Sequence, residues 1–142
     1  MDFEEVKVRM TGFIQATGIA PSEIAIGAGV ALMYHGLRES AKDIDISVSI
    51  EAFEALRKEK GLEEGVMIVP WDDVIDVHVR ENNVGESIPT VWGCFYNLSE
   101  LIEQKVKLLL LKTRSTEKHA QDAADLHAIN VKLREMAKLH LA

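Results

Sequence analysis

The eight residues from Asp43 to Ile50 alternate polar and apolar side chains without a break, in the order DIDISVSI. Side chains on a β-strand point alternately to opposite faces, so this pattern predicts a strand with one polar and one apolar face. The apolar face consists of isoleucine and valine, which favour strands. We therefore expect a sheet in which this strand packs its apolar face on the core.

The polar face of the same strand begins with Asp43 and Asp45. Aspartate is uncommon in strands, and two like charges on one face repel each other. Both costs vanish when a cation lies between the carboxylates. The pair therefore predicts a metal-binding site, and the alternative is an ordinary solvent-facing strand surface.

A glycine-containing turn precedes this strand. We expect a short strand over residues 23–26, then the turn Gly27-Ala28-Gly29, then a helix over residues 30–35. Backbone amides at such a turn are suited to bind phosphate, and the alternative is a tight strand-to-helix connection without a ligand. The spacing matches neither the dinucleotide-binding glycine fingerprint nor the P-loop.

A second alternating segment runs from Val74 to Arg80 and places Asp76 and His78 on one face. Isoleucine and valine occupy the other face, so this segment also predicts a strand packed on the core. Asp76 is the third carboxylate that a metal site containing Asp43 and Asp45 requires. His78 is either a strand-surface histidine or a further ligand.

Helical periodicity predicts amphipathic helices over residues 2–16, 51–60, 97–112 and 117–141. Residues 81–96 are expected to form a loop, because they are rich in asparagine and glycine and contain a proline. The aromatic side chains clustered in this segment either close one end of the core or cover a bound base.

The two C-terminal helices each carry a charged residue on the apolar stripe. Lys105 falls on the stripe of the first, and a buried unpaired ammonium is costly, so it requires an anionic partner or must extend to the surface. A bound phosphate is one such partner. Asp122 continues the inner stripe of the second helix, whose expected inner residues include Met136. We expect Asp122 to pair with Lys105 or Arg38.

Length and charge narrow the class of protein. The 142 residues suffice for one domain, and the net charge of −7 without a basic patch does not favour a nucleic-acid-binding module. No apolar run approaches the ~20 residues that a membrane span requires. The single cysteine, Cys94, and the lack of a leader pattern at the N-terminus predict a cytoplasmic protein.

Taken together, these segments resemble the nucleotidyltransferase superfamily that includes DNA polymerase β. The likeness is to its small bacterial and phage branch, which contains minimal nucleotidyltransferases and the toxins of abortive-infection systems. One difference lies in the turn, where Ala28 stands in place of the second glycine or serine and supplies no hydroxyl. The residues that carry the likeness are Gly27, Gly29, Arg38, Ser40, Lys42, Asp43, Asp45, Asp76, Asp122 and Asp125.

The resemblance implies an α+β fold in two layers, with helices packed on a mixed sheet. It implies one domain over residues 1–142, with a catalytic-type core over residues 24–80 and a C-terminal helical part over residues 97–141. It also implies two Mg²⁺ ions, about 3.5–4 Å apart, and an NTP as substrate. The metal ligands would be Asp43, Asp45 and Asp76, and the nucleotide contacts would be Gly27, Gly29, Arg38, Ser40 and Lys105, supported by Asp122.

The activity implied is transfer of a nucleoside monophosphate from the NTP to a hydroxyl of a protein, an RNA or a small molecule. Asp76 would also accept the proton of that hydroxyl. The alternative is a catalytically inactive domain of the same fold, which binds a nucleotide or a cognate partner protein as half of a toxin–antitoxin pair.

Overall fold

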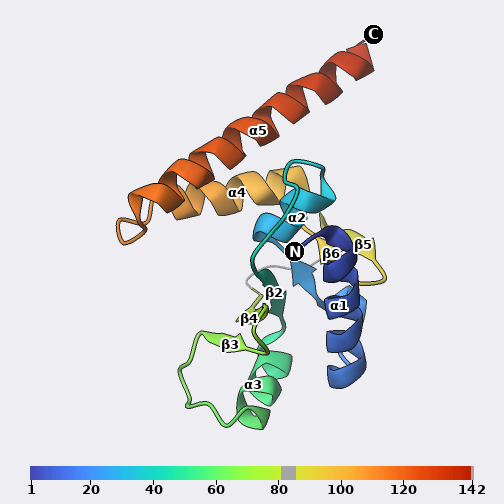
Figure 1. Ribbon diagram of the computed structural model, residues 1–142, viewed down its shortest axis with the longest axis vertical. Helices are drawn as coiled ribbons and strands as arrows, with labels where there is room; N and C mark the ends of the chain where they lie inside the picture. The colour runs from blue at the N-terminus through green and yellow to red at the C-terminus, as the bar shows by residue number, and fades with distance from the viewer. Residues whose placement is uncertain (81–85, 142) are drawn as a thin grey trace. The chain divides into compact units, whose positions relative to one another are not determined.

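The structure, a computed structural model, describes residues 1–80 and 86–141 and divides the chain into two compact units, Met1–Asn97 and Leu98–Ala142 (Figure 1). Within the described residues there are five α-helices, one 3-10 helix and six strands. The helices are α1 (Phe3–Thr17), η1 (Pro21–Glu23), α2 (Ala28–Tyr34), α3 (Ile50–Glu59), α4 (Leu98–Leu109) and α5 (Thr116–Leu141). The strands are β1 (Ala25–Ile26), β2 (Ile44–Val48), β3 (Ile68–Pro70), β4 (Ile75–Val79), β5 (Ile88–Thr90) and β6 (Gly93–Phe95).

The strands of the first unit form one mixed sheet in the order β3-β4-β2-β1-β6-β5. The pairs β2–β4 and β1–β6 are parallel, and the other three pairs are antiparallel. The expected mixed sheet with helices is therefore confirmed. Its two aspartate-bearing strands, β2 and β4, are neighbours.

The strand predicted over residues 43–50 is correct in its faces but too long at both ends, because β2 begins at Ile44 and ends at Val48. Ile44, Ile46 and Val48 are fully buried, as the alternation predicts. Ser49, however, caps α3 by accepting a hydrogen bond from an amide of the first turn. Ile50 is consequently the first residue of that helix and is 51% exposed, because a serine N-cap ends the strand before it.

The N-terminal helix confirms the prediction for residues 2–16. Asp2 caps its first turn, and Gly18 ends it with a positive φ of 71°, a conformation that glycine adopts without strain. Its buried face consists of Val6, Met10 and Phe13.

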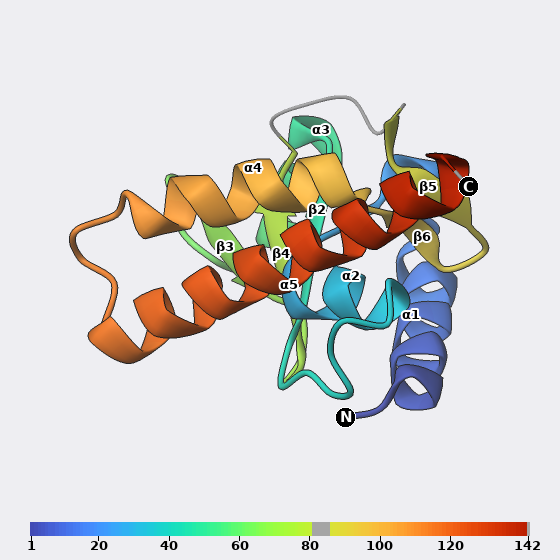
Figure 2. The same ribbon diagram turned by 90° about the horizontal axis from the view of Figure 1, so that it is seen from above.

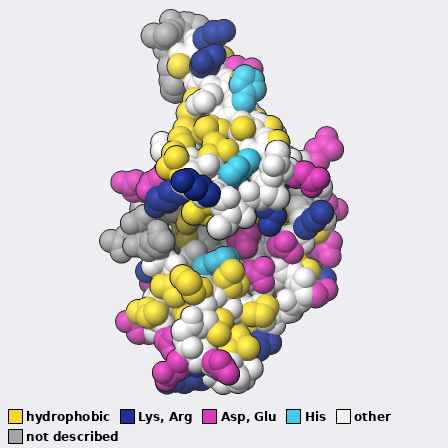
Figure 3. Space-filling view, turned by 90° about the vertical axis from the view of Figure 1, so that its left-hand side faces the viewer, with side chains coloured by type: hydrophobic (Ala, Val, Ile, Leu, Met, Phe, Trp, Pro, Cys, Tyr) yellow, Lys and Arg dark blue, Asp and Glu magenta, His cyan; other side chains and the backbone are white. Residues whose placement is uncertain are grey.

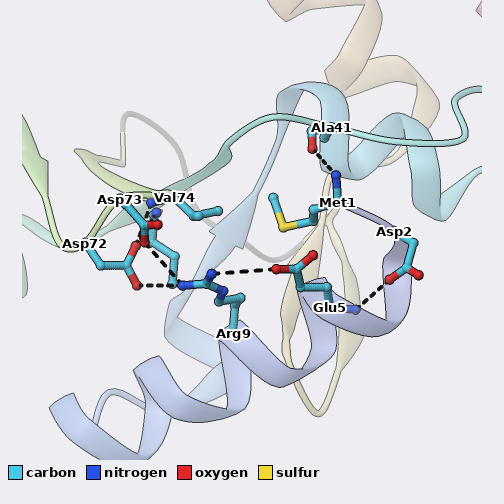
Figure 4. Close-up of polar contacts among 9 residues, drawn as sticks. Met1, Asp2, Glu5, Arg9, Ala41, Asp72, Asp73 and Val74 are labelled. Carbon is cyan, nitrogen blue, oxygen red and sulfur yellow. Dashed lines mark hydrogen bonds and ion pairs between the residues drawn. The ribbon is translucent and has the colours of Figure 1, made fainter.

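Polar contacts connect α1 to the segments that lead into β2 and β4 (Figure 4). The Arg9 guanidinium lies 3.3 Å from Asp73 and 3.8 Å from Asp72, in the turn before β4. The N-terminal amine of Met1 donates to the carbonyl oxygen of Ala41, two residues before Asp43, at 3.0 Å. The segment that leads to β4 is therefore held by α1, and the segment that leads to β2 by the residue two positions before α1.

The predicted loop over residues 81–96 is wrong for its second half. Residues 88–95 form the hairpin of β5 and β6, and β6 pairs in parallel with β1. Each strand has only three residues and the hairpin contains a proline and a glycine, which obscured the alternation. Phe95 is fully buried and stacks on Tyr34 at 4.5 Å, so this aromatic residue belongs to the core. Residues 81–85 lie outside the described part of the chain.

Two smaller predictions also differ from the structure. Glu23, expected in the first strand, ends the 3-10 helix η1, and the strand β1 has only two residues. The helix after the glycine turn begins at Ala28 instead of residue 30.

The second unit consists of α4 and α5, which lie alongside each other (Figure 2). Ile129 of α5 is fully buried, as predicted, but Met136 is 42% exposed. The reason is length: α4 has 12 residues and α5 has 26, and each residue adds about 1.5 Å, so α4 covers only part of α5. Among the described residues, no helix is long and apolar enough to cross a membrane.

Candidate functional site

Two of the predicted aspartates lie opposite each other in the sheet. Asp45 on β2 is the register partner of Asp76 on β4. Neighbouring strands are about 4.8 Å apart, and the buried isoleucines beside each aspartate show that both carboxylates project from the opposite face to the core. The predicted clustering of these two residues is therefore confirmed.

Asp43 lies immediately before β2 and is exposed. Its charge reaches the pair, because the pKa of Asp76 is raised above its ordinary value by burial and by the charges of Asp45 and Asp43. His78 acts in the opposite direction and lowers the pKa of Asp76. Asp72 raises this pKa as well, so the aspartate group, which we define as Asp43, Asp45 and Asp76, is a set of like charges around the carboxyl of Asp76.

His78 contacts this group directly. Its Nε2 atom lies 3.2 Å from Oδ1 of Asp45, although its register partner on β2 is Ser47. The contact is therefore diagonal across the two strands. The side chains of His78 and Asp45 are 35% and 37% exposed. Sequence reasoning treated His78 as a surface or ligand residue and missed this bond, which requires the register of β2 and β4 to be known.

The chemistry of this donor set fits a hard divalent cation. Carboxylate oxygens are preferred ligands of Mg²⁺, which binds one or two carboxylates together with water and substrate phosphate instead of an all-protein cage. Within residues 1–80 and 86–141, no three His, Cys, Asp or Glu side chains converge closely enough to hold a metal ion by themselves.

The glycine turn lies beside the aspartate strand. The backbone N–H of Gly27 donates to the carbonyl oxygen of Asp45 at 3.2 Å, which links the start of α2 to β2. Ala28 has a positive φ of 51°, and among the described residues it is the one non-glycine with this property. Such a conformation costs about 1–2 kcal/mol for a residue with a Cβ atom. Backbone strain is therefore present at the predicted phosphate turn.

Arg38 lies against the same turn. A Cβ atom placed on Gly29 would be 2.6 Å from Nη1 of Arg38, so the absence of a side chain at Gly29 makes room for the guanidinium. Ser40, from the same connection, is exposed. The structure thus places Arg38 beside Gly29, one of the two glycines of the predicted phosphate turn.

Lys105 and Asp122 lie in the second unit, where their expected pairing is confirmed. Lys105 Nζ is 3.2 Å from Oδ1 of Asp122 and 3.0 Å from Oδ2 of Asp125, and all three residues are buried. Arg114 adds two contacts to Oδ2 of Asp122, at 2.9 and 3.0 Å. Sequence reasoning missed Arg114, which lies in the turn between α4 and α5 and shows no periodicity.

The surface of the first unit is mixed in character. The lower part of Figure 3 carries acidic side chains beside apolar ones, and Met67 and Ile68 are 81% and 44% exposed. With a net charge of −7, such a surface repels a polyanion unless cations intervene.

The fold and the site define a class: a mixed α/β protein with coupled aspartates on adjacent parallel strands beside a glycine turn. No family model matches the chain, and comparison with curated proteins and with solved structures gives no significant match.

Proposed function

We propose that this protein is a metal-dependent nucleotidyltransferase that moves a nucleoside monophosphate from an NTP to an acceptor hydroxyl. The observation that supports this most is the pairing of Asp45 with Asp76 on adjacent parallel strands. The bond between Gly27 and Asp45 adds to it, because a predicted phosphate turn then adjoins the predicted metal ligands.

In this proposal Asp43, Asp45 and Asp76 hold Mg²⁺, which when bound neutralises charge on the triphosphate and orients it. Arg38 supplies a permanent positive charge with several N–H donors for phosphate oxygens. Gly29 leaves the guanidinium room against the turn.

Asp76 is the proposed acceptor for the proton of the attacking hydroxyl. An efficient general base has a pKa near the working pH, and the pKa of Asp76 is displaced in that direction by burial and by its acidic neighbours.

Lys105 receives no catalytic role in this proposal. It contacts two buried carboxylates in the helical unit, which neutralise its charge. We therefore assign Lys105 and Asp122 to the stability of the α4–α5 pair, and the phosphate contact to Arg38.

A second candidate is a catalytically inactive domain that binds a nucleotide or a partner protein. One observation favours it: Ala28 occupies the turn with a positive φ and supplies no hydroxyl for a phosphate. The two candidates differ in turnover and share the fold.

Calorimetry with Mg²⁺ and each NTP tests nucleotide binding, with Asp45→Asn as the site variant. Glu63→Gln is the matched control, because Glu63 is an exposed acid of the same unit outside the group. We expect binding by the wild type and the control and a loss of at least tenfold in Asp45→Asn. Absence of binding for every NTP would rule out the transferase and the nucleotide-binding form of the second candidate, and would leave only the domain that binds a partner protein.

Incubation of the protein with labelled NTPs and cell extract separates transfer from binding. Labelling of an acceptor by the wild type and by Glu63→Gln, but not by Asp45→Asn, is the result expected of a transferase. Binding without labelling would instead support the inactive domain.

A further inference from the structure

His78 is a polar neighbour of the aspartate group, and the proposed function gives it no task. It lies on β4, two residues after Asp76, and reaches across to β2. Its Nε2 atom is 3.2 Å from Oδ1 of Asp45. An ionised carboxylate only accepts hydrogen bonds, so in this contact Nε2 carries the hydrogen and donates it.

This bond contributes little to stability. The side chains of His78 and Asp45 are both more than one-third exposed, at 35% and 37%. Water competes with polar pairs at such exposure, and their contribution to folding is small. The small contribution of this hydrogen bond to folding stability therefore does not by itself explain the contact between His78 and Asp45.

The same bond has a larger consequence for the direction of the Asp45 carboxylate. The side chain of Asp45 is half-exposed, and the donor on His78 fixes the position of Oδ1. The other carboxylate oxygen keeps its lone pairs for another ligand. Hydrogen bonds of this kind to metal-binding side chains typically change metal affinity by about 10–100-fold.

We propose that His78 is a positioning residue, which holds Oδ1 of Asp45 so that the carboxylate is oriented to bind the divalent cation. The inference rests on the proposed function, since it concerns the same metal ligands. It differs from the expectation of a further ligand, because His78 acts through Asp45 and does not bind the cation.

Titration of the metal-free protein with Mn²⁺, a spectroscopic substitute for Mg²⁺, tests this role in His78→Ala and His78→Gln. Glutamine retains an N–H donor of similar reach, whereas alanine does not. His127→Ala is the control, because His127 is an exposed histidine of the other unit. We expect His78→Ala to weaken Mn²⁺ binding about 10–100-fold, and His78→Gln and the control to stay within about threefold of the wild type.

Thermal unfolding of the same variants without metal provides a second readout. A positioning role predicts unfolding midpoints close to the wild type in both His78 variants, with a difference only in metal affinity. Equal weakening in His78→Gln and His78→Ala, or a large fall in the midpoint of both, would overturn the assignment in favour of a packing role.

A third measurement separates this inference from the proposed function. Long-range ¹H–¹⁵N spectra of the imidazole report which ring nitrogen carries the hydrogen, and we expect Nε2, with a change of signal in Asp45→Asn. Mn²⁺ binding that His78→Ala leaves unchanged would overturn the positioning role alone. Absence of Mn²⁺ binding in the wild type, both alone and together with NTP, would overturn the proposed function, and the positioning role with it.

Discussion

Asp45 and Asp76 face each other across the parallel strands β2 and β4, with their carboxylates on the same side of the sheet. Two like charges in this position oppose folding, and together with burial, which is the larger cause, they raise the pKa of Asp76. This pair of carboxylates therefore destabilises the folded protein, and a cation bound between them would remove the repulsion.

The first prediction concerns pH. The pKa of Asp76 in the folded protein lies above its ordinary value of 3.8, so the folded state binds more protons than the unfolded state between the two values. The contribution of Asp76 to the free energy of unfolding therefore falls as pH rises from 3.8 through the folded-state pKa. Above the folded-state pKa the charged carboxylate destabilises the folded protein to its full extent. Asp76→Asn removes this cost, and we expect a higher unfolding midpoint than the wild type at pH 7.

Unfolding midpoints across pH 3–8 check this prediction, with Glu63→Gln as the control. The advantage of Asp76→Asn should shrink towards acid pH, where Asp76 is protonated in both states. Mg²⁺ should raise the midpoint of the wild type more than that of Asp76→Asn. A variant that is less stable than the wild type at pH 7 would contradict the sign.

The second prediction concerns Gly29. In Gly29→Ala the new Cβ atom would lie 2.6 Å from Nη1 of Arg38, so the guanidinium must move away from the turn. Because a flexible side chain can yield, we expect little loss of stability but about tenfold weaker NTP binding, consistent with about 1.5–3 kcal/mol for a hydrogen bond to a charged group.

Calorimetry with NTP checks this effect, and Gly12→Ala is the matched control. No atom lies within 4 Å of a Cβ atom placed on Gly12, which is inside α1. This control should bind NTP normally and be more stable by about 0.5–1 kcal/mol, as alanine favours helices. Equal NTP binding by Gly29→Ala and the wild type would place Arg38 outside the nucleotide site.

The third prediction concerns Ala28 and its φ of 51°. Ala28→Gly relieves backbone strain, partly offset by the greater entropy of glycine in the unfolded chain, so we expect a gain of up to about 1 kcal/mol in unfolding free energy. Denaturant unfolding measures it. A loss of stability would show that the methyl group of Ala28 contributes more by packing than its conformation costs.

Ala28→Ser tests the missing hydroxyl at the same position. If the turn binds phosphate, the added donor should strengthen NTP binding severalfold without the change in stability expected of glycine. Calorimetry compares the two variants directly. Unchanged affinity in Ala28→Ser would indicate that phosphate does not contact this residue.

The fourth prediction concerns the helical unit. Lys105→Met leaves Asp122 and Asp125 buried beside each other with Arg114 as the remaining cation, and we expect a loss of about 3–5 kcal/mol in unfolding free energy. Lys107→Met, on the exposed side of the same helix, is the control and should change stability by less than about 0.5 kcal/mol. Equal effects would mean that the buried contacts of Lys105 add no net stability.

The C-terminal helices show which features helical periodicity predicts and which it does not. The stripe of α4 placed Lys105 inward and that of α5 placed Asp122 inward, which made their pairing predictable because a buried charge requires a partner. The end of the stripe was not predictable. Met136 is exposed because α4 is too short to cover it, and the length of a neighbouring helix is invisible in local periodicity.

The hairpin of β5 and β6 shows where local pattern fails. Three-residue strands are too short for alternation to be recognised, and β6 exists because β1 offers it a parallel partner. The amides and carbonyls of such a strand are satisfied by a segment almost seventy residues earlier in the chain. A local signal for this strand is therefore absent.

By itself the sequence determined which residues face the core and which acids share a strand face, because alternation and helical periodicity follow from backbone geometry alone. It predicted in this way that Asp45 and Asp76 lie on the polar faces of strands, whereas Asp43 proves to precede β2. The tertiary structure decided the register of β2 against β4, and hence that Asp45 meets Asp76 directly and His78 diagonally. Register depends on contacts between segments distant in the chain, so the coupling of the site arises only in the folded sheet.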